Sequence, residues 1–322
     1  MVFSFPSSVL LVVVFLLLQQ KHLGVASQAC SSFTVDGGGG VWSVAHVAPK
    51  NAVDRSSVLG PFCGEYYVGV VLSNITLTCR DYCSVISCLG SNTTINSFSA
   101  NAVTLNVGEF SDAVGLIGTT ALGNVTFNRV YVTNLNVSYK VGTTFNSISA
   151  AAAWIGQIYG RVSVGYGMFT INVAWSPPPL PSAITVASSD QGFFVGDMRE
   201  NASLVLGGDV NCTLKRVLVV ILSADGNNNN GFSMFPSSPT IDLACTVFVA
   251  RQGVRVFPRF PTTALPTTLY TVIYGDQELL QQIQVPPPQR LKARFNTLVT
   301  RLGLDPLYFT YSTTAPTFLV PR

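Results

Sequence analysis

The sequence is poor in charged residues. Asp, Glu, Lys and Arg make up 10% of its 322 residues, whereas 48% are hydrophobic. Disordered chains and nucleic-acid-binding domains carry far more charge, so the composition argues against both classes. The formal net charge of +3 is also too small to indicate a phosphate-binding surface. We therefore expect a folded chain with a large core and no nucleic-acid partner.

Histidine is scarce as well, because the chain has two and one of them lies in a predicted leader. A histidine-containing triad would need His46 as its base, and no Gly-x-Ser-x-Gly elbow supplies the nucleophile. A histidine-rich metal centre is excluded. Asp190, Asp197, Glu200 and Asp209 are close in sequence, and paired acids cleave glycosides, but these acids stand among turn residues. We expect no catalytic residue, no cofactor and no metal site.

Long apolar runs are absent except near the start. Ten apolar residues run from Val9 to Leu18 and are followed by the small residues Val25–Ser27, which is typical of a secretory signal peptide over residues 1–28. An uncleaved membrane anchor is the alternative, since no Lys or Arg precedes the run and Lys21 follows it. The longest later run, Val217–Leu222, has six residues, and the C-terminus carries no lipid-anchor signal. We expect a secreted or cell-surface protein whose membrane association is at most peripheral.

Seven cysteines are present, namely Cys30, Cys63, Cys79, Cys83, Cys88, Cys212 and Cys245. Outside the cell most should form disulfides, and the odd count leaves one thiol free or joined to another chain. Zinc binding is the alternative for the early group, but the spacing lacks two CxxC-type knuckles and no histidine is near. Cys212 and Cys245, each in an alternating apolar segment, are the pair that the pattern favours.

Six N-glycosylation sequons occur, at Asn74, Asn92, Asn124, Asn136, Asn201 and Asn211. Around Asn74, Asn124 and Asn136 apolar residues alternate with polar ones. Successive side chains of a strand point to opposite faces, so these asparagines should point away from the buried face. The sequence therefore predicts a glycoprotein with glycans in solvent.

Strand patterns dominate from Tyr66 to Trp175 and resume after a Pro-rich connector. Between Asn124 and Tyr139 the alternation changes phase and then returns, which indicates short strands separated by bends. The polar stretch Asp225–Gly231 partly matches a calcium loop but lacks the closing acid, so we interpret it as a loop between strands.

One helix is predicted near the C-terminus. Its apolar stripe consists of Leu291, Phe295, Leu298, Val299 and Leu302, and Gly303 ends it. A basic amphipathic helix can dock on a membrane or a partner. The commoner role is to cap a core, and here it would also cover open strand edges at the end of an array.

A pattern of glycine and apolar residues before an alternating strand occurs twice. The copies are Val114–Gly118 with Gly123–Asn128, and Ile155–Gly160 with Val162–Val164. Two looser copies lie on either side. The four copies together have the marker glycines Gly69, Gly115, Gly156 and Gly196, spaced by 46, 41 and 40 residues. A recurring period of this size is typical of repeat architectures.

The two copies resemble GLUG-type repeats, which occur in adhesin-like bacterial surface proteins and in secreted or surface proteins of flagellate protists. The resemblance extends roughly from Tyr66 to Leu214. It implies a β-solenoid-like stack on an extracellular protein, with no catalytic residues to carry over. The units here are longer than a compact GLUG repeat, and residues after Thr246 lack the motif.

The predicted fold is all-β, a β-solenoid or β-helix-like repeat array with a short C-terminal amphipathic helix. The predicted segments are a signal peptide (1–28), an N-terminal Cys- and Gly-containing segment (29–64), a GLUG-like β-repeat region (65–176), a Pro-rich connector (177–182), a second β region (183–285), and a C-terminal helix and tail (286–322). We expect a structural or adhesive glycoprotein that binds a surface or matrix partner, either protein or glycan. The alternatives are a viral envelope-type glycoprotein ectodomain and a β-helix enzyme acting on polysaccharides.

Overall fold

The computed structural model describes residues 41–45, 50–52, 56–59, 61–62, 65–79, 82–107, 112–140, 149–176, 192–208, 212–224, 233–236, 240–250, 254, 256–257, 271–274, 292–306, 309–310 and 320–321. The predicted signal peptide (1–28) and the Pro-rich connector (177–182) lie outside these ranges.

The described part of the chain is mostly β, and its two large sheets are parallel. The first sheet consists of β1 (Val41–Ala45), β2 (Lys50–Ala52), β4 (Tyr66–Tyr67), β5 (Gly69–Cys79), β7 (Thr93–Val107), β9 (Asn124–Lys140), β12 (Arg161–Ser176), β14 (Ser203–Leu206), β15 (Val217–Ala224), β16 (Ile241–Asp242), β17 (Thr246–Ala250) and β18 (Thr271–Tyr274). The second consists of β3 (Ser56–Leu59), β6 (Tyr82–Leu89), β8 (Asp112–Thr120), β10 (Ser149–Ala151), β11 (Ile155–Ile158) and β13 (Val195–Met198). We call them the long sheet and the short sheet.

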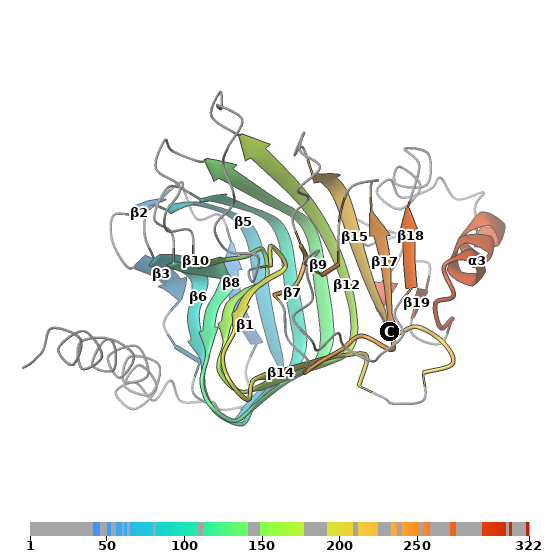
Figure 1. The fold of residues 1–322 in the computed structure, drawn as a ribbon, viewed down its shortest axis with the longest axis horizontal. Helices are drawn as coiled ribbons and strands as arrows, with labels where there is room; N and C mark the ends of the chain where they lie inside the picture. Colours follow the sequence, from blue (N-terminus) through green and yellow to red (C-terminus); the bar gives the residue numbers. More distant parts are fainter. Residues whose placement is uncertain are drawn as a thin grey trace, which may run out of the picture.

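From β5 to β14 the chain alternates between the two sheets, whereas β15 to β18 all belong to the long sheet. From β5 to β9 the chain passes from the long sheet to the short sheet and back, so that β5, β7, β9 and β12 lie side by side in the long sheet while β6, β8, β11 and β13 lie side by side in the short one (Figure 1). The strand pairings described within these two sheets are all parallel. The row continues from β12 through β15, β17 and β18, so strands from both sides of the predicted connector share one sheet.

We call the stretch of chain from one strand of the long sheet to the next strand paired with it a passage. The pairing register gives the length of each passage. Val70 lies opposite Phe98 and Phe98 lies opposite Val130, which gives offsets of 28 and 32 residues. Val130 lies opposite Gly167, an offset of 37 residues that falls to 36 at Leu135 and Ile171. The length of the passage therefore varies while the strands stay in register.

The change of phase between Asn124 and Tyr139 indicated short strands, but the structure has one continuous strand there, β9, and two bends within it account for the change. Asn128 and Arg129 are both exposed, so the buried positions move from Phe127 to Val130. Asn134 has a φ of 50° and shifts the phase again. Its neighbours in β5 and β7, Asn74 and Ala102, have φ values of 51° and 52°, so the same left-handed bend recurs in three adjacent strands.

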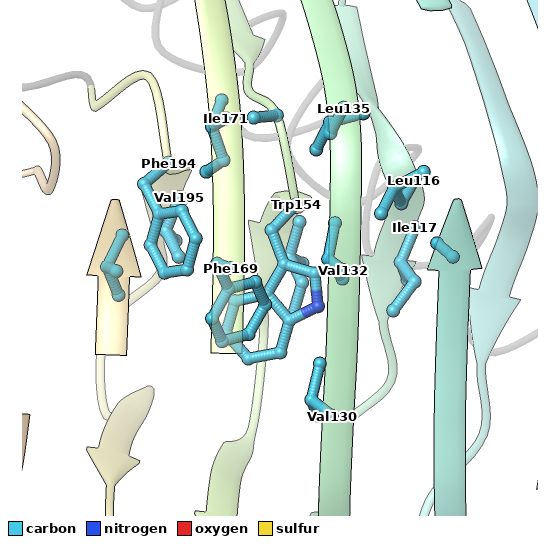
Figure 2. Packing of buried hydrophobic residues seen from close by; sticks show 14 of the residues in the cluster. Leu116, Ile117, Val130, Val132, Leu135, Trp154, Phe169, Ile171, Phe194 and Val195 are labelled. Atoms are coloured by element: carbon cyan, nitrogen blue, oxygen red, sulfur yellow. The ribbon is translucent and has the colours of Figure 1, made fainter. Parts of the chain in front are cut away.

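The main core lies between the two sheets. Trp154, directly before β11, is fully buried, and its ring lies 5.6 Å from Phe127, 5.1 Å from Phe169 and 5.3 Å from Phe194 (Figure 2). The aromatic contacts continue from Phe194 to Phe235 at 5.5 Å. Aliphatic side chains from both sheets surround these rings, including Leu116, Ile117, Val132, Ile171 and Val195. The sheets are thus joined by one apolar interior.

A second, smaller core lies on the outward face of the long sheet. The helix α3 (Lys292–Arg301) buries Leu298, Val299 and Leu302 against it. The strand residues beneath them are Met168 of β12, Leu218 and Val220 of β15, and Val247 and Val249 of β17. The apolar run Val217–Leu222 is continuous because β15 is buried on both faces.

The helix was predicted correctly, but its place differs from the expectation that it covers open strand edges. It packs on a sheet face, because outward positions of β15 and β17 are apolar and must be covered. Gly303, at a φ of 64°, ends the helix, and the amide of Leu304 donates to the carbonyl of Val299 at 3.0 Å. The antiparallel pair β19 (Phe309–Thr310) and β20 (Val320–Pro321) follows.

Candidate functional site

Away from α3, the outward face of the long sheet carries polar side chains in place of the apolar ones beneath the helix. Across β5, β7, β9 and β12, many outward positions carry small polar side chains that stack in register from strand to strand, although the column of Val71, Ser99, Tyr131 and Met168 does not follow this pattern. One such column is Thr76, Thr104, Asn136 and Asn172, and another is Ser73, Asn101 and Thr133, of which Thr133 is buried. A third is Thr78, Asn106 and Ser138. None of these residues is charged, and we call this surface the ladder face.

Hydrogen bonds join the ladder face across strands. Asn101 Oδ1 accepts from Thr133 Oγ1 at 2.8 Å and from Asn134 Nδ2 at 3.1 Å. Asn106 Oδ1 accepts from Ser138 Oγ at 2.7 Å, and its Nδ2 donates to Thr78 Oγ1 at 3.4 Å. Such side-chain bonds hold the polar groups in fixed positions, so the face is ordered before any partner arrives.

Two further bonds extend the pattern. Asn172 Nδ2 donates to Asn136 Oδ1 at 3.1 Å, and Asn128 Nδ2 donates to Asn96 Oδ1 at 3.2 Å. These columns were not predicted from the sequence. Between β7 and β9 their signal is a repeated offset of 32 residues between polar positions, as between Asn96 and Asn128.

A second feature is the corner where the chain leaves the short sheet and enters the long one. Asn124 lies opposite Arg161, and Arg161 lies opposite Ser203, so the corners of successive passages are stacked. The backbone amide of Asn124 donates to Asn92 Oδ1 at 3.4 Å. A Cβ at Gly160 would overlap the carbonyl oxygen of Gly123, so this close approach requires glycine.

The predicted sequons fall on both features. Asn92 and Asn124 lie on the corner, and Asn201 lies in the turn before β14; all three are exposed. Asn74 is exposed in β5. Asn136 is half-buried within the ladder face, where its Nδ2 donates to the carbonyl of Asn134 at 3.4 Å. Asn211 lies outside the described residues.

The predicted marker glycines occupy different places. Gly115, Gly156 and Gly196 belong to the short sheet, whereas Gly69 begins β5 of the long sheet and lies opposite Val41. Ile155 lies opposite Ile117 and Val195, which sets Gly156 beside Gly196 but beside Gly118 rather than Gly115. In the structure Gly156 is thus aligned with Gly118, which lies three residues after Gly115, the glycine that the sequence pattern aligned with it.

The same register aligns an earlier segment, which was not predicted from the sequence, with the first copy of the pattern. Ile86 lies opposite Ile117, and Thr93 lies opposite Val125. Residues 86–93 therefore occupy the place that residues 117–125 occupy one passage later. Ser87 occupies the position that Gly118 occupies one passage later, so this segment lacks the glycine by which the pattern was identified.

The cysteines are only partly described. Cys212 and Cys245 lie at disulfide distance, with Cα atoms 5.2 Å apart, as the pattern favoured. Cys88 is buried, and its thiol donates to the carbonyl of Leu89 at 3.4 Å. Cys79 lies in β5 and Cys83 in β6, while Cys30 and Cys63 lie outside the described residues.

Close to that pair, the Lys215 ammonium donates to the carbonyl of Ala244. Burial lowers the pKa of Lys215. The backbone of Lys215 also pairs with the end of α3, because its amide donates to Gly303 at 3.0 Å and its carbonyl accepts from Asp305 at 2.9 Å. The loop that holds Cys212 is therefore fastened to the C-terminal helix.

Of the four acids considered for catalysis, Asp197 and Glu200 belong to the described residues. Asp197 lies opposite Gln157 and forms an ion pair with Arg199 at 3.3 Å, and Glu200 is exposed. Asp190, Asp209 and His46 lie outside the described residues. Among the described side chains, no three of His, Cys, Asp and Glu gather in a way that could hold a metal ion.

In the described part of the chain, no helix combines the length and apolar character needed to cross a bilayer. Comparison of the sequence with protein-family models and with curated proteins, and of the fold with solved structures, gives no match.

Proposed function

We propose that the chain is a β-solenoid in which each circuit contributes one strand to the long sheet and one to the short sheet. Two observations support this architecture: the strands alternate between the sheets, and neighbours such as β7 and β9 pair in parallel with an offset of one circuit. The GLUG-type likeness belongs to the same proposal, with its repeat unit assigned to the short-sheet strand and the corner that follows.

This solenoid is a secreted or cell-surface glycoprotein with a structural or adhesive role and no catalytic activity. The observation that carries the proposal is the ladder face, an uncharged array of hydroxyl and carboxamide groups fixed by bonds such as Ser138 to Asn106. Neighbouring strands are about 4.8 Å apart, so the face offers donors and acceptors at a regular spacing. A fixed array binds an extended partner with little loss of side-chain entropy.

The partner class that fits this face is a neutral surface or matrix component, either a polysaccharide or a protein rich in polar uncharged groups. A charged partner would gain no ion pairs on the columns that contain Asn101, Thr104 and Asn106. Many weak contacts along the sheet would add up, as expected of an adhesive surface.

The test uses the protein secreted from a eukaryotic cell, with its N-terminus determined by mass spectrometry. Binding to immobilised neutral polysaccharides and matrix proteins is measured for wild type, for Thr104→Lys on the ladder face and for Leu122→Lys. Leu122 is 61% exposed on the corner, so its variant is the matched control of equal charge. We expect Thr104→Lys to weaken binding at least about tenfold, or about 1.4 kcal/mol, and Leu122→Lys to leave it unchanged.

Equal binding by Thr104→Lys and wild type would contradict an adhesive role for this face. Retention of the unprocessed chain inside the cell would contradict secretion. Release of reducing sugar ends from any polysaccharide in the panel would favour the enzyme alternative instead.

A further inference from the structure

The stacked corner brings two N-glycosylation sequons together. Asn92 and Asn124 are 32 residues apart in sequence, but each directly precedes one of the paired residues Thr93 and Val125. Asn124 donates its backbone amide to Asn92 Oδ1 at 3.4 Å. Both side chains are exposed, so each alone is accessible to modification.

We infer that Asn92 and Asn124 form one shared glycosylation site, which carries a single N-linked oligosaccharide in the folded protein. This inference rests on the proposed passage through the secretory pathway. Adjacent strands lie about 4.8 Å apart. A branched oligosaccharide is wider than that spacing, so two of them on neighbouring positions would collide at their first sugars.

The chemistry of each asparagine is compatible with one glycan. Transfer from a lipid-pyrophosphate oligosaccharide joins Asn Nδ2 to the anomeric carbon of the first sugar, releases the lipid pyrophosphate and removes one carboxamide proton. A glycan on Asn92 leaves Oδ1 unmodified, so Asn92 can still accept from Asn124. Asn92 also has a φ of 58°, which turns the backbone at the corner and presents the side chain to solvent.

The limit of one glycan per molecule comes from the folded structure and not from the sequons themselves. The transferring enzyme meets the chain before β7 and β9 pair, so it can modify either asparagine. A chain modified at both must hold two glycans on adjacent strands to pair Thr94 with Thr126, and it therefore folds poorly and fails to leave the cell. The secreted protein consequently consists of two singly modified forms.

One tryptic peptide reports the result directly. No Lys or Arg lies between Arg80 and Arg129, so residues 81–129 form a single peptide that contains both sequons. Its mass counts the glycans on each molecule. The preceding peptide, residues 56–80, contains Asn74 alone and serves as a reference for glycosylation in general.

The experiment compares intact glycopeptides of secreted wild type with Thr94→Val and Thr126→Val, which remove one sequon each while keeping both asparagines. These threonines pair with each other and are both half-buried, so the variants are matched. We expect no peptide with two glycans in secreted wild type. We also expect loss of the more occupied sequon to raise occupancy of the other site at least about twofold, because in wild type the less occupied site carries the single glycan in at most half of the molecules.

A third variant, Phe127→Asp, places a charge at a fully buried position and prevents the fold while keeping both sequons. Peptide 81–129 from its cell lysate should include the doubly modified form. Two glycans on the secreted wild-type peptide overturn the inference, as does a single-glycan limit that persists in the Phe127→Asp lysate. Absence of glycans from every peptide, including that of Asn74, overturns the proposed secretion itself.

Discussion

Asn101 and Thr133 are 32 residues apart in sequence, yet their side chains share a 2.8 Å hydrogen bond across two neighbouring strands. Asn101 also accepts from Asn134, so one carboxamide holds two groups of the next strand. The bond shows how the long sheet is stabilised on its polar side as well as by its core.

Replacement of this carboxamide tests the ladder face. Asn101→Ala removes the acceptor of two hydrogen bonds, and we expect it to lower the free energy of unfolding by about 1–2 kcal/mol. Asn96→Ala is the matched control, since Asn96 accepts one bond from the exposed Asn128 and should cost less. Denaturant titration of both variants measures the difference; equal stability of Asn101→Ala and wild type would contradict a stabilising ladder.

Gly115 lies where the backbones of two passages approach each other. A Cβ built there would be 2.8 Å from the carbonyl oxygen of Ile117 and 3.0 Å from that of Trp154. We expect Gly115→Val to lower the free energy of unfolding by at least about 2 kcal/mol, because backbone must move. Ser99→Val, which adds the same side chain on the outward face of β7, should change it by less than about 1 kcal/mol. Unchanged thermal unfolding of Gly115→Val would refute this reading.

Trp154 joins the two sheets through its ring contacts with Phe127, Phe169 and Phe194. Trp154→Ala should cost about 3–5 kcal/mol, since it removes a fully buried aromatic side chain. Trp154→Phe keeps most of the volume and should cost clearly less. Chemical denaturation followed by far-UV circular dichroism measures both. A cost for Trp154→Phe equal to that for Trp154→Ala would mean that ring packing is not what holds the sheets together.

The Cys212–Cys245 pair should be present as a disulfide in the secreted protein. Under non-reducing conditions, trypsin should release peptides 200–215 and 217–251 as one linked species that separates on reduction. The double variant Cys212→Ser with Cys245→Ser should lose about 2–4 kcal/mol of unfolding free energy, because the linked positions are 33 residues apart in sequence. Two separate peptides in the non-reduced digest would exclude the bond.

The helix α3 should protect an apolar sheet surface. Leu302→Asp places a charge at a position that is 1% exposed, beside the strand residues Leu218 and Val249. We expect release of the helix, stronger binding of a hydrophobic dye and self-association detected by light scattering. Thr297→Asp adds the same charge on the exposed side of the helix and should do none of this. Leu302→Asp that remains monomeric and dye-free would argue against the covering role.

The all-β character, the helix and the Cys212–Cys245 pair could be predicted, because each leaves a local pattern in the chain. The phase changes near Asn128 and Asn134 were also visible, since a bend displaces the buried positions by one residue. The register was not predictable in the same way. Gly115 and Gly156 look equivalent in sequence, but pairing across strands depends on the intervening length, and that length places Gly118 opposite Gly156.

The position of α3 could not be predicted for a related reason. The stripe that ends at Leu302 indicates that one side is buried, but it does not say what lies beneath. The sheet surface that the helix covers was visible in the sequence as the continuous apolar run Val217–Leu222, which indicates a strand buried on both faces. The ladder face was likewise hidden, because Asn, Ser and Thr in single strands are unremarkable until the register aligns them.

The varying offsets between paired strands have a consequence for how such a chain can change in length. Passages of 28, 32 and 36 to 37 residues all deliver the next strand to the same side of the long sheet. Residues inserted between strands therefore enlarge a loop, whereas duplication of a whole passage would lengthen the molecule by one strand width. A protein built in this way can extend its polar surface in discrete steps without redesigning its interior.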